Sequence, residues 1–123
     1  SIAGAEPIGP KRMFDVLIVV PCTGNTLAKL SHGITDTTAA MAVKSHLRSE
    51  RPVVLALSTN DALAASAENI GRLLNRRHYY FVPFGQDDPE SKPRSLVSEL
   101  SLLPETMEAA LEGRQLQPIL VSF

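Results

Sequence analysis

Three short apolar runs, each followed by a segment long enough for a helix, constrain the fold of this chain more than any other feature of its sequence. The runs span residues 14–20, 52–58 and 79–83. They consist mainly of β-branched, aliphatic and aromatic residues without regular polar alternation, which is typical of strands that are covered on both faces. We therefore expect three strands at the centre of a layered domain.

Helical spacing of apolar residues in the intervening segments completes this picture. The predicted helices span residues 26–33, 36–48 and 64–77. Strands that are joined by crossovers of about a dozen residues or more pair in parallel, with right-handed connections. The sequence therefore predicts an α/β fold with a Rossmann-like, three-layer α/β/α parallel sheet. Pro21 is expected to end the first strand and Gly33 the first helix, with Thr35 or Asp36 as the N-cap of the second.

The last third of the chain is less regular. Residues 95–103 and 104–111 predict a final helical region, which follows a polar loop at residues 85–93. The apolar tail, residues 117–123, is expected to form either a last edge strand or an arm that packs on a neighbouring subunit.

Charge and composition narrow the classes of partner. The chain has 12 Lys and Arg against 13 Asp and Glu, and no basic block is longer than two residues, so nucleic acid is not an expected partner. No run approaches the roughly 20 apolar residues of a membrane span. The single cysteine, Cys22, cannot form an internal disulfide and is compatible with a reducing compartment. We expect a globular, cytoplasmic protein.

Polar and small residues follow each of the three predicted strands. The segments are PCTGNT at residues 21–26, STNDA at residues 58–62 and FGQDDPE at residues 84–90. Ligands of open parallel sheets bind beyond the carboxyl ends of the strands, so the three segments are expected to form one binding site. A helix that begins at PCTGNT would also offer unpaired N–H groups to an anionic group such as a phosphate.

Two interpretations of the PCTGNT turn remain open from its residue types. The hydroxyls of Thr23 and Thr26 and the carboxamide of Asn25 can bind a ligand, and Gly24 lets the backbone approach one closely. The alternative is that Thr23 or Asn25 merely caps the following helix. The position after a strand and the similar composition after Ser58 favour a ligand site.

Other reactive residues have simpler explanations. Cys22 lacks a neighbouring His and carboxylate in the sequence and is interpreted as an apolar filler rather than a nucleophile. The three histidines, 14 and 32 residues apart, do not have metal-ligand spacing, and no metal is predicted. The acidic residues of the 85–93 loop favour a solvated turn, whereas Asp36 and Asp61 are candidates for either function or helix capping.

Residues 21–47, PCTGNTLAKLSHGITDTTAAMAVKSHL, resemble the second signature region of a flavoprotein family. This family includes flavin-containing cysteine decarboxylases, phosphopantothenoylcysteine decarboxylase and the flavin prenyltransferases. Pro21, Asn25 and Thr26 match the family's Pro-Ala-Ser-Ala-Asn-Thr-like turn, and Gly33 and Asp36 match its later Gly and Asp pair. Residues 4–11, 53–63 and 79–93 extend the resemblance over almost the whole chain.

The resemblance implies a site and a cofactor. Thr23, Gly24, Asn25 and Thr26 would line FMN, with Asn25 also near the substrate as a catalytic residue, and Thr59 and Asn60 would contact flavin or substrate. The family's first strand and its phosphate-binding turn have no match in residues 1–12. We therefore expect residues 1–123 to be a single flavoprotein-like domain that forms the C-terminal portion of a longer one.

The resemblance also implies a biological role. The chain would be an oxidoreductase subunit that contributes to oxidising a dihydrodipicolinate-pathway precursor in the mother cell of a spore former. Its expected partners are a separate A subunit that resembles a nucleotide-binding dehydrogenase and supplies NADPH, a small dicarboxylate substrate, and further copies of the chain in a homo-oligomer. Lys11, Lys29 or Arg94 would be the cations for the dicarboxylate.

Two alternatives stay open on the same scaffold. One is an FMN-dependent decarboxylase or prenyltransferase, although ALSTNDAL stands where the decarboxylases carry a Pro-x-Met-Asn-x-x-Met-Trp motif. The other is a non-catalytic scaffold that stabilises the A subunit.

Overall fold

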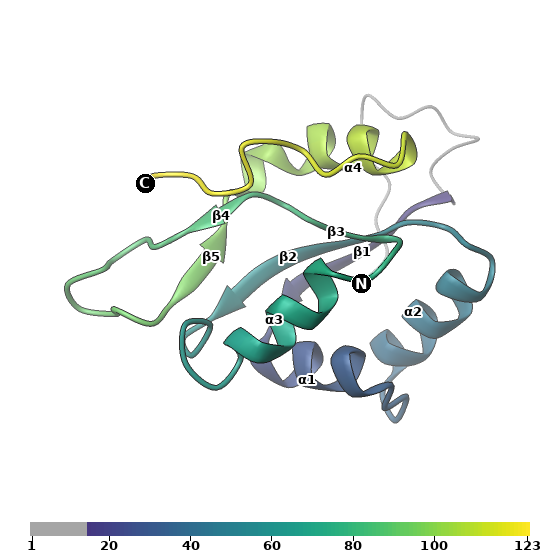
Figure 1. Cartoon of the computed structure of the whole chain (residues 1–123), viewed down its shortest axis with the longest axis horizontal. Coiled ribbons are helices and arrows are strands. Elements are labelled where there is room, and N and C mark those ends of the chain that lie inside the picture. The colour runs from purple at the N-terminus through teal and green to yellow at the C-terminus, as the bar shows by residue number, and fades with distance from the viewer. Residues whose placement is uncertain (1–14) are drawn as a thin grey trace.

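A computed structural model describes residues 15–123, which form three layers (Figure 1). A sheet lies in the middle, with α1 (Gly24–His32), α2 (Thr38–Arg48) and α3 (Ala67–Leu74) against one face and α4 (Leu103–Leu111) against the other. The α/β fold class with a layered sheet is thus confirmed.

The parallel part of the sheet is built from the three predicted strands. They are β1 (Leu17–Cys22), β2 (Val53–Thr59) and β3 (Tyr79–Phe81). Leu17 is aligned with Val53, and Val53 with Tyr79, in parallel pairs on both sides of β2. Successive β2 residues are buried on opposite faces: Leu55 belongs to the core under α1 to α3, whereas Val54 and Ala56 belong to the core under α4. Coverage on both faces explains why these runs lack polar alternation.

The first strand continues through Pro21, contrary to the prediction that this proline would end it. Val19 is aligned with Leu55, but Cys22 is aligned with Leu57, so β1 carries one extra residue in this interval. Pro21 lies within the irregular interval and is exposed. A proline is tolerated at such an irregularity because its missing N–H is not needed for the ladder.

The helix boundaries also differ in part from the predictions. Gly33 ends α1 in the left-handed conformation, with φ 71°, as expected. The N-cap of α2 is Thr37, whose hydroxyl accepts a hydrogen bond from the Ala40 N–H, rather than Thr35 or Asp36. Asp36 instead pairs with Lys29 at 2.5 Å between Oδ1 and Nζ. α3 is shorter than predicted at both ends.

The prediction of a helix over residues 95–103 is wrong for its first half. β5 (Leu96–Ser98) runs antiparallel to the end of β2, with Thr59 aligned with Leu96, and antiparallel to β4 (Phe84–Gly85). A single 3₁₀ turn, η2 (Leu100–Leu102), then leads into α4. The sheet is therefore mixed rather than wholly parallel.

The C-terminal tail lies along β4 as an irregular edge of the sheet. The Phe84 N–H donates to the Ile119 carbonyl at 2.9 Å, and the Val121 N–H donates to the Phe84 carbonyl at 3.0 Å. A Cβ atom on Gly85 would lie 2.1 Å from the Val121 carbonyl oxygen, so this close approach requires glycine. Of the two expectations for the tail, the contacts within the chain match the edge strand.

No helix within residues 15–123 is both long and apolar enough to cross a membrane.

Candidate functional site

The three polar segments that follow the strands meet in one open pocket of about 550 Å³. The pocket lies at the carboxyl ends of β1 and β2, and the β4–β5 hairpin forms its third wall. Its lining residues are Thr23, Gly24, Ser58, Thr59, Asn60, Asp87, Lys92, Ser95, Leu96 and Val97. The expected convergence of these segments is therefore observed, and the pocket combines hydroxyl and amide groups with an apolar wall.

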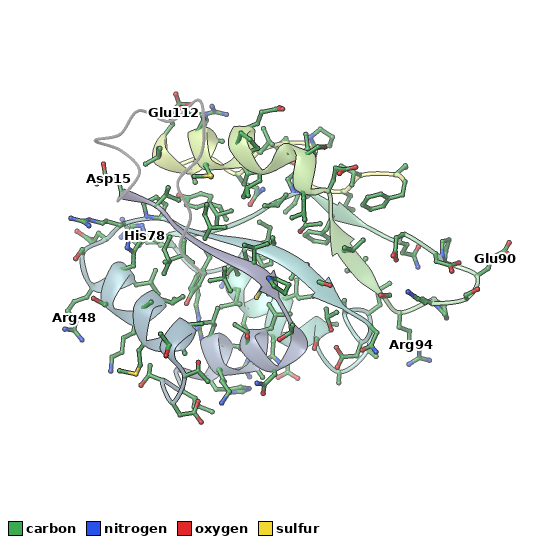
Figure 2. The ribbon with its side chains drawn as sticks, turned by 180° about the vertical axis from the view of Figure 1, so that it is seen from behind. Asp15, Arg48, His78, Glu90, Arg94 and Glu112 are labelled. Atoms are coloured by element: carbon green, nitrogen blue, oxygen red, sulfur yellow. The ribbon has the colours of Figure 1, made fainter. Side chains whose placement is uncertain are left out.

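Hydrogen bonds fix the hairpin against the end of β2. The Ser95 hydroxyl donates to the Thr59 carbonyl at 3.2 Å, and the Leu63 N–H donates to the Arg94 carbonyl at 3.0 Å. Beyond these contacts the hairpin extends away from the body of the sheet, with Glu90 near its tip (Figure 2). The wall next to β2 is thus held in place by the chain itself.

Thr23 both caps α1 and lines the pocket, so the two interpretations of the turn are compatible. Its hydroxyl accepts a hydrogen bond from the Thr26 N–H and donates one to the Thr26 hydroxyl, each at 3.4 Å. Asn25 is exposed on the first turn of α1 and, like Thr26, is not among the residues that line the pocket. Four of the six predicted cofactor contacts, Thr23, Gly24, Thr59 and Asn60, therefore lie in the pocket wall.

A compact hydrogen-bond network lies directly behind this wall. Asp61 Oδ1 accepts hydrogen bonds from the Thr59 hydroxyl at 2.5 Å and from the buried Ser66 hydroxyl at 2.8 Å. These two bonds, that from Thr59 first, hold the pKa of Asp61 below its usual value. Asp61 is therefore ionised at neutral pH. It is not the N-cap of α3, which begins at Ala67.

Gly24 packs against the same network. A Cβ atom at this position would lie 2.9 Å from Ser66 Oγ, 3.0 Å from Asp61 Oδ1 and 3.2 Å from Thr59 Oγ1. The sequence suggests a glycine that permits close approach to a ligand. In the structure, the groups that approach the glycine are the three oxygens of the network.

The remaining candidates from the sequence lie elsewhere or are inert. Cys22 is buried, and burial raises the pKa of its thiol to about 12, as expected for an apolar filler. Among the residues lining the pocket there is no histidine. Residues 15–123 contain no group of three or more His, Cys, Asp and Glu side chains arranged to hold a metal ion.

The cation in the pocket wall is one that the sequence interpretation missed. Lys92 lines the pocket from the hairpin, whereas Lys29 is paired with Asp36, and Arg94 is exposed and does not line it. Lys11 lies outside the described residues. Lys92 belongs to a polar loop that we interpret from the sequence as a solvated turn. Only the fold of the hairpin shows that Lys92 lines the pocket.

A second pocket, of about 340 Å³, lies between α1, α2 and the start of β3. It is lined mainly by apolar side chains, including Leu30, Val43 and Tyr79. None of the predicted cofactor contacts is part of it. The carboxyl-edge pocket is therefore the candidate site.

The fold and this pocket define an α/β protein with a candidate ligand site at the carboxyl edge of its sheet. Residues 3–108 match the family model described as Flavoprotein, and the chain belongs to this family. It is 50% identical over 121 residues to the B subunit of dipicolinate synthase from Bacillus subtilis (strain 168), a match that covers 98% of this chain and 60% of that protein.

Solved structures give a consistent result. The fold is similar to that of the B subunit of dipicolinate synthase from Bacillus halodurans, with a TM-score of 0.87 and 48% identity over 95% of this chain and 60% of that one. It is also similar, with a TM-score of 0.57 and 27% identity, to the FMN-dependent cysteine decarboxylase SpaF, over 78% of this chain and 52% of that one. The chain spans about 60% of the length of the two dipicolinate synthase relatives.

Proposed function

We propose that this chain belongs to a B subunit of dipicolinate synthase and contributes to oxidising a dihydrodipicolinate-pathway precursor to dipicolinate during sporulation. The proposal rests on the similarity to two proteins of that name. The structural observation that supports it is the pocket in which the ends of β1 and β2 and the β4–β5 hairpin converge. Chemistry at this place is expected in a layered α/β sheet.

The proposed cofactor is FMN, which fits the groups present in the pocket. Its volume of about 550 Å³ lies within the usual range for small-molecule sites, roughly 300–1,000 Å³. Thr23, Thr59 and Asn60 offer hydroxyl and amide groups for a polar ring edge or a ribityl chain, and Leu96 and Val97 offer apolar surface. A bound flavin would supply hydride-transfer chemistry, while the chain binds and orients it.

Asn25 and Thr26 complete the proposed set from the first turn of α1. Asn25 is exposed there, so its carboxamide is accessible to a substrate group. We propose Asn25 as the residue that contacts the substrate, with Thr26 beside it toward the cofactor. Both positions directly follow Thr23 and Gly24, which lie in the wall of the pocket.

The proposed partners follow from the name of the relatives. A B subunit implies an A subunit, which we propose to carry NADPH, and we further propose a homo-oligomer of these chains in the mother-cell cytoplasm. The substrate would be a small dicarboxylate, for which Lys92 is the cation in the pocket wall. Nucleic acid and membrane partners are not proposed.

A second candidate function is FMN-dependent decarboxylation, favoured by the similarity to SpaF. A third is a scaffold without catalysis that stabilises the A subunit. An Asn25→Ala variant separates the scaffold from a catalytic synthase subunit. A scaffold would keep full activity in the complex, whereas a catalytic subunit would lose synthase activity while the complex stays intact.

The decisive experiment is an absorbance spectrum of the full-length protein purified with its A subunit. We expect a flavin band in the visible blue and oxidation of the dihydrodipicolinate-pathway precursor. A colourless but active complex would contradict the flavin proposal. Flavin-dependent decarboxylation of a cysteinyl substrate without synthase activity would favour the second candidate.

A further inference from the structure

Asp61 contacts the pocket wall without lining the pocket. The residue is absent from the lining of the pocket, but it accepts a hydrogen bond from Thr59, which does line it. Its second partner, Ser66, is buried. Asp61 can therefore act on a ligand in two ways, through its hydrogen bond to Thr59 and through its charge beside Gly24.

The first such effect concerns the direction of the Thr59 hydroxyl. An ionised carboxylate can only accept hydrogen bonds, so the Thr59 hydroxyl must donate its proton to Asp61 Oδ1 across the 2.5 Å contact. Thr59 Oγ1 also accepts the Asp61 N–H at 3.4 Å. What Thr59 has left for a ligand is a lone pair. It can accept a hydrogen bond from a ligand, but it has no proton to donate.

The second effect concerns charge at the start of α1. Gly24 is the first residue of this helix, and a Cβ atom there would lie 3.0 Å from Asp61 Oδ1. The carboxylate is therefore beside the positive end of the helix, and there is no acidic residue in the first turn of α1 itself. A second anion at this helix start would be close to Asp61 and would be repelled by it.

We propose that Asp61 is a positioning residue that reserves this wall for an uncharged, hydrogen-bond-donating part of the ligand and keeps phosphate away from the start of α1. The inference rests on the proposed function for the identity of the ligand. The sequence predicts that the PCTGNT turn can bind an anionic group such as a phosphate. The presence of Asp61 changes this expectation for phosphate. In a flavin complex, the wall made by Thr59 and Gly24 receives the ring or the ribityl chain, and the phosphate lies elsewhere.

The first test follows backbone amide signals by NMR while inorganic phosphate is added. In the wild-type protein, the signals of Gly24, Asn25 and Thr26 should not shift. In Asp61→Asn they should shift with saturation, because the repelling charge has been removed. The charge-matched control is Glu68→Gln on the exposed surface of α3, which should behave like wild type. Saturable shifts in the wild type, or the same response in Asp61→Asn and wild type, would overturn the proposal.

The second test measures flavin affinity by fluorescence in a double-mutant cycle. Asp61→Ala, which removes the acceptor that an asparagine would keep, and Thr59→Val should each weaken binding about tenfold, and the double variant should be no weaker than Thr59→Val alone, since Asp61 acts on this part of the ligand through Thr59. Thr59→Ser keeps the hydroxyl and should recover most of the affinity that Thr59→Val loses. Additive losses would overturn the proposal. Absence of flavin binding by the wild type would count against the proposed function, while the phosphate titration still decides the role of Asp61.

Discussion

At the scale of single residues, Asp61 and Cys22 both lie near the carboxyl ends of parallel strands but have opposite electrostatic surroundings. Asp61 is half-buried and accepts two hydroxyl hydrogen bonds, so its pKa is lowered and it stays charged. Cys22 is fully buried at the end of β1, and burial raises the pKa of its thiol to about 12. One residue is thus kept as a charge beside the pocket, and the other is kept as neutral packing in the core.

The raised pKa of Cys22 predicts how stability depends on alkaline pH. The unfolded chain loses the thiol proton near 9.0, whereas the folded chain keeps it to about 12. Between these values the unfolded state binds fewer protons. The free energy of unfolding should therefore fall as pH rises, by up to about 1.4 kcal/mol per pH unit. Urea unfolding should show a steeper alkaline loss for wild type than for Cys22→Ala; parallel curves would contradict this.

Substitution of Gly24 should destabilise the protein, because this residue packs against the hydrogen-bond network of Asp61. Gly24→Ala gains helix propensity, but its methyl group would force the oxygens of Thr59, Asp61 and Ser66 apart, which typically costs about 1–3 kcal/mol. We expect net destabilisation of about 1 kcal/mol and weaker flavin binding. The matched control is Gly71→Ala in α3, where a Cβ atom meets nothing within 4 Å.

In chemical denaturation, Gly71→Ala should gain up to about 1 kcal/mol from helix propensity alone. The two alanines should therefore shift the unfolding midpoint in opposite directions. If Gly24→Ala instead stabilises the protein, the oxygens of the network can move apart at little cost in free energy.

At the scale of elements, β5 is a segment whose sequence pattern predicts a helix but whose tertiary contacts make it a strand. Its apolar residues have a spacing that suits a helix, yet pairing with the end of β2 makes it a strand, and strand propensity depends on such neighbours. The Ser98 hydroxyl accepts the Leu57 N–H and donates to the Val82 carbonyl, both at 2.8 Å. A serine at the end of a short strand thus bridges two segments of backbone that the sequence alone does not connect.

Removing this bridge should be costly. Ser98→Ala would leave a buried N–H and a buried carbonyl without their partner, and each such group costs about 1–3 kcal/mol. We expect a loss of at least about 2 kcal/mol in the free energy of unfolding. Ser101→Ala, at an exposed position in η2, is the control and should change stability little. Equal stabilities of the two variants in thermal or urea unfolding would argue against the bridging role of Ser98.

At the scale of the whole molecule, the sequence predicts the part of the site that depends on parallel strands. Cys22 is aligned with Leu57, so the residues that follow β1 and β2 reach the same level of the sheet. This follows from parallel pairing of two apolar runs, and it brings Thr23 to the same pocket as Thr59. The hairpin wall depends on an antiparallel return, for which the sequence has no periodic signal, and Lys92 was missed for that reason.

The hydrogen-bond network of Asp61 could not be predicted from the sequence for a related reason. Asp61, Ser66 and Gly24 come from two different turns, and only the packing of α1 against the end of β2 brings their atoms together. The sequence pattern marks Asp61 as a candidate for function or capping. It does not show which hydroxyls the carboxylate orients.

The position of Lys92 leads to a prediction about the complete site. As the cation in the pocket wall, Lys92 should attract a dicarboxylate through its charge, although its exposure limits the gain to about 1 kcal/mol. Lys92→Gln should therefore weaken the binding of dipicolinate, measured by calorimetry, up to about fivefold at low salt. The difference should shrink as ionic strength rises, because salt screens exposed charges. Arg94→Gln removes the same charge two residues away, outside the pocket lining, and should leave affinity nearly unchanged. Equal weakening in both variants would mean that the net charge of the hairpin, rather than the place of Lys92 in the pocket, attracts the ligand.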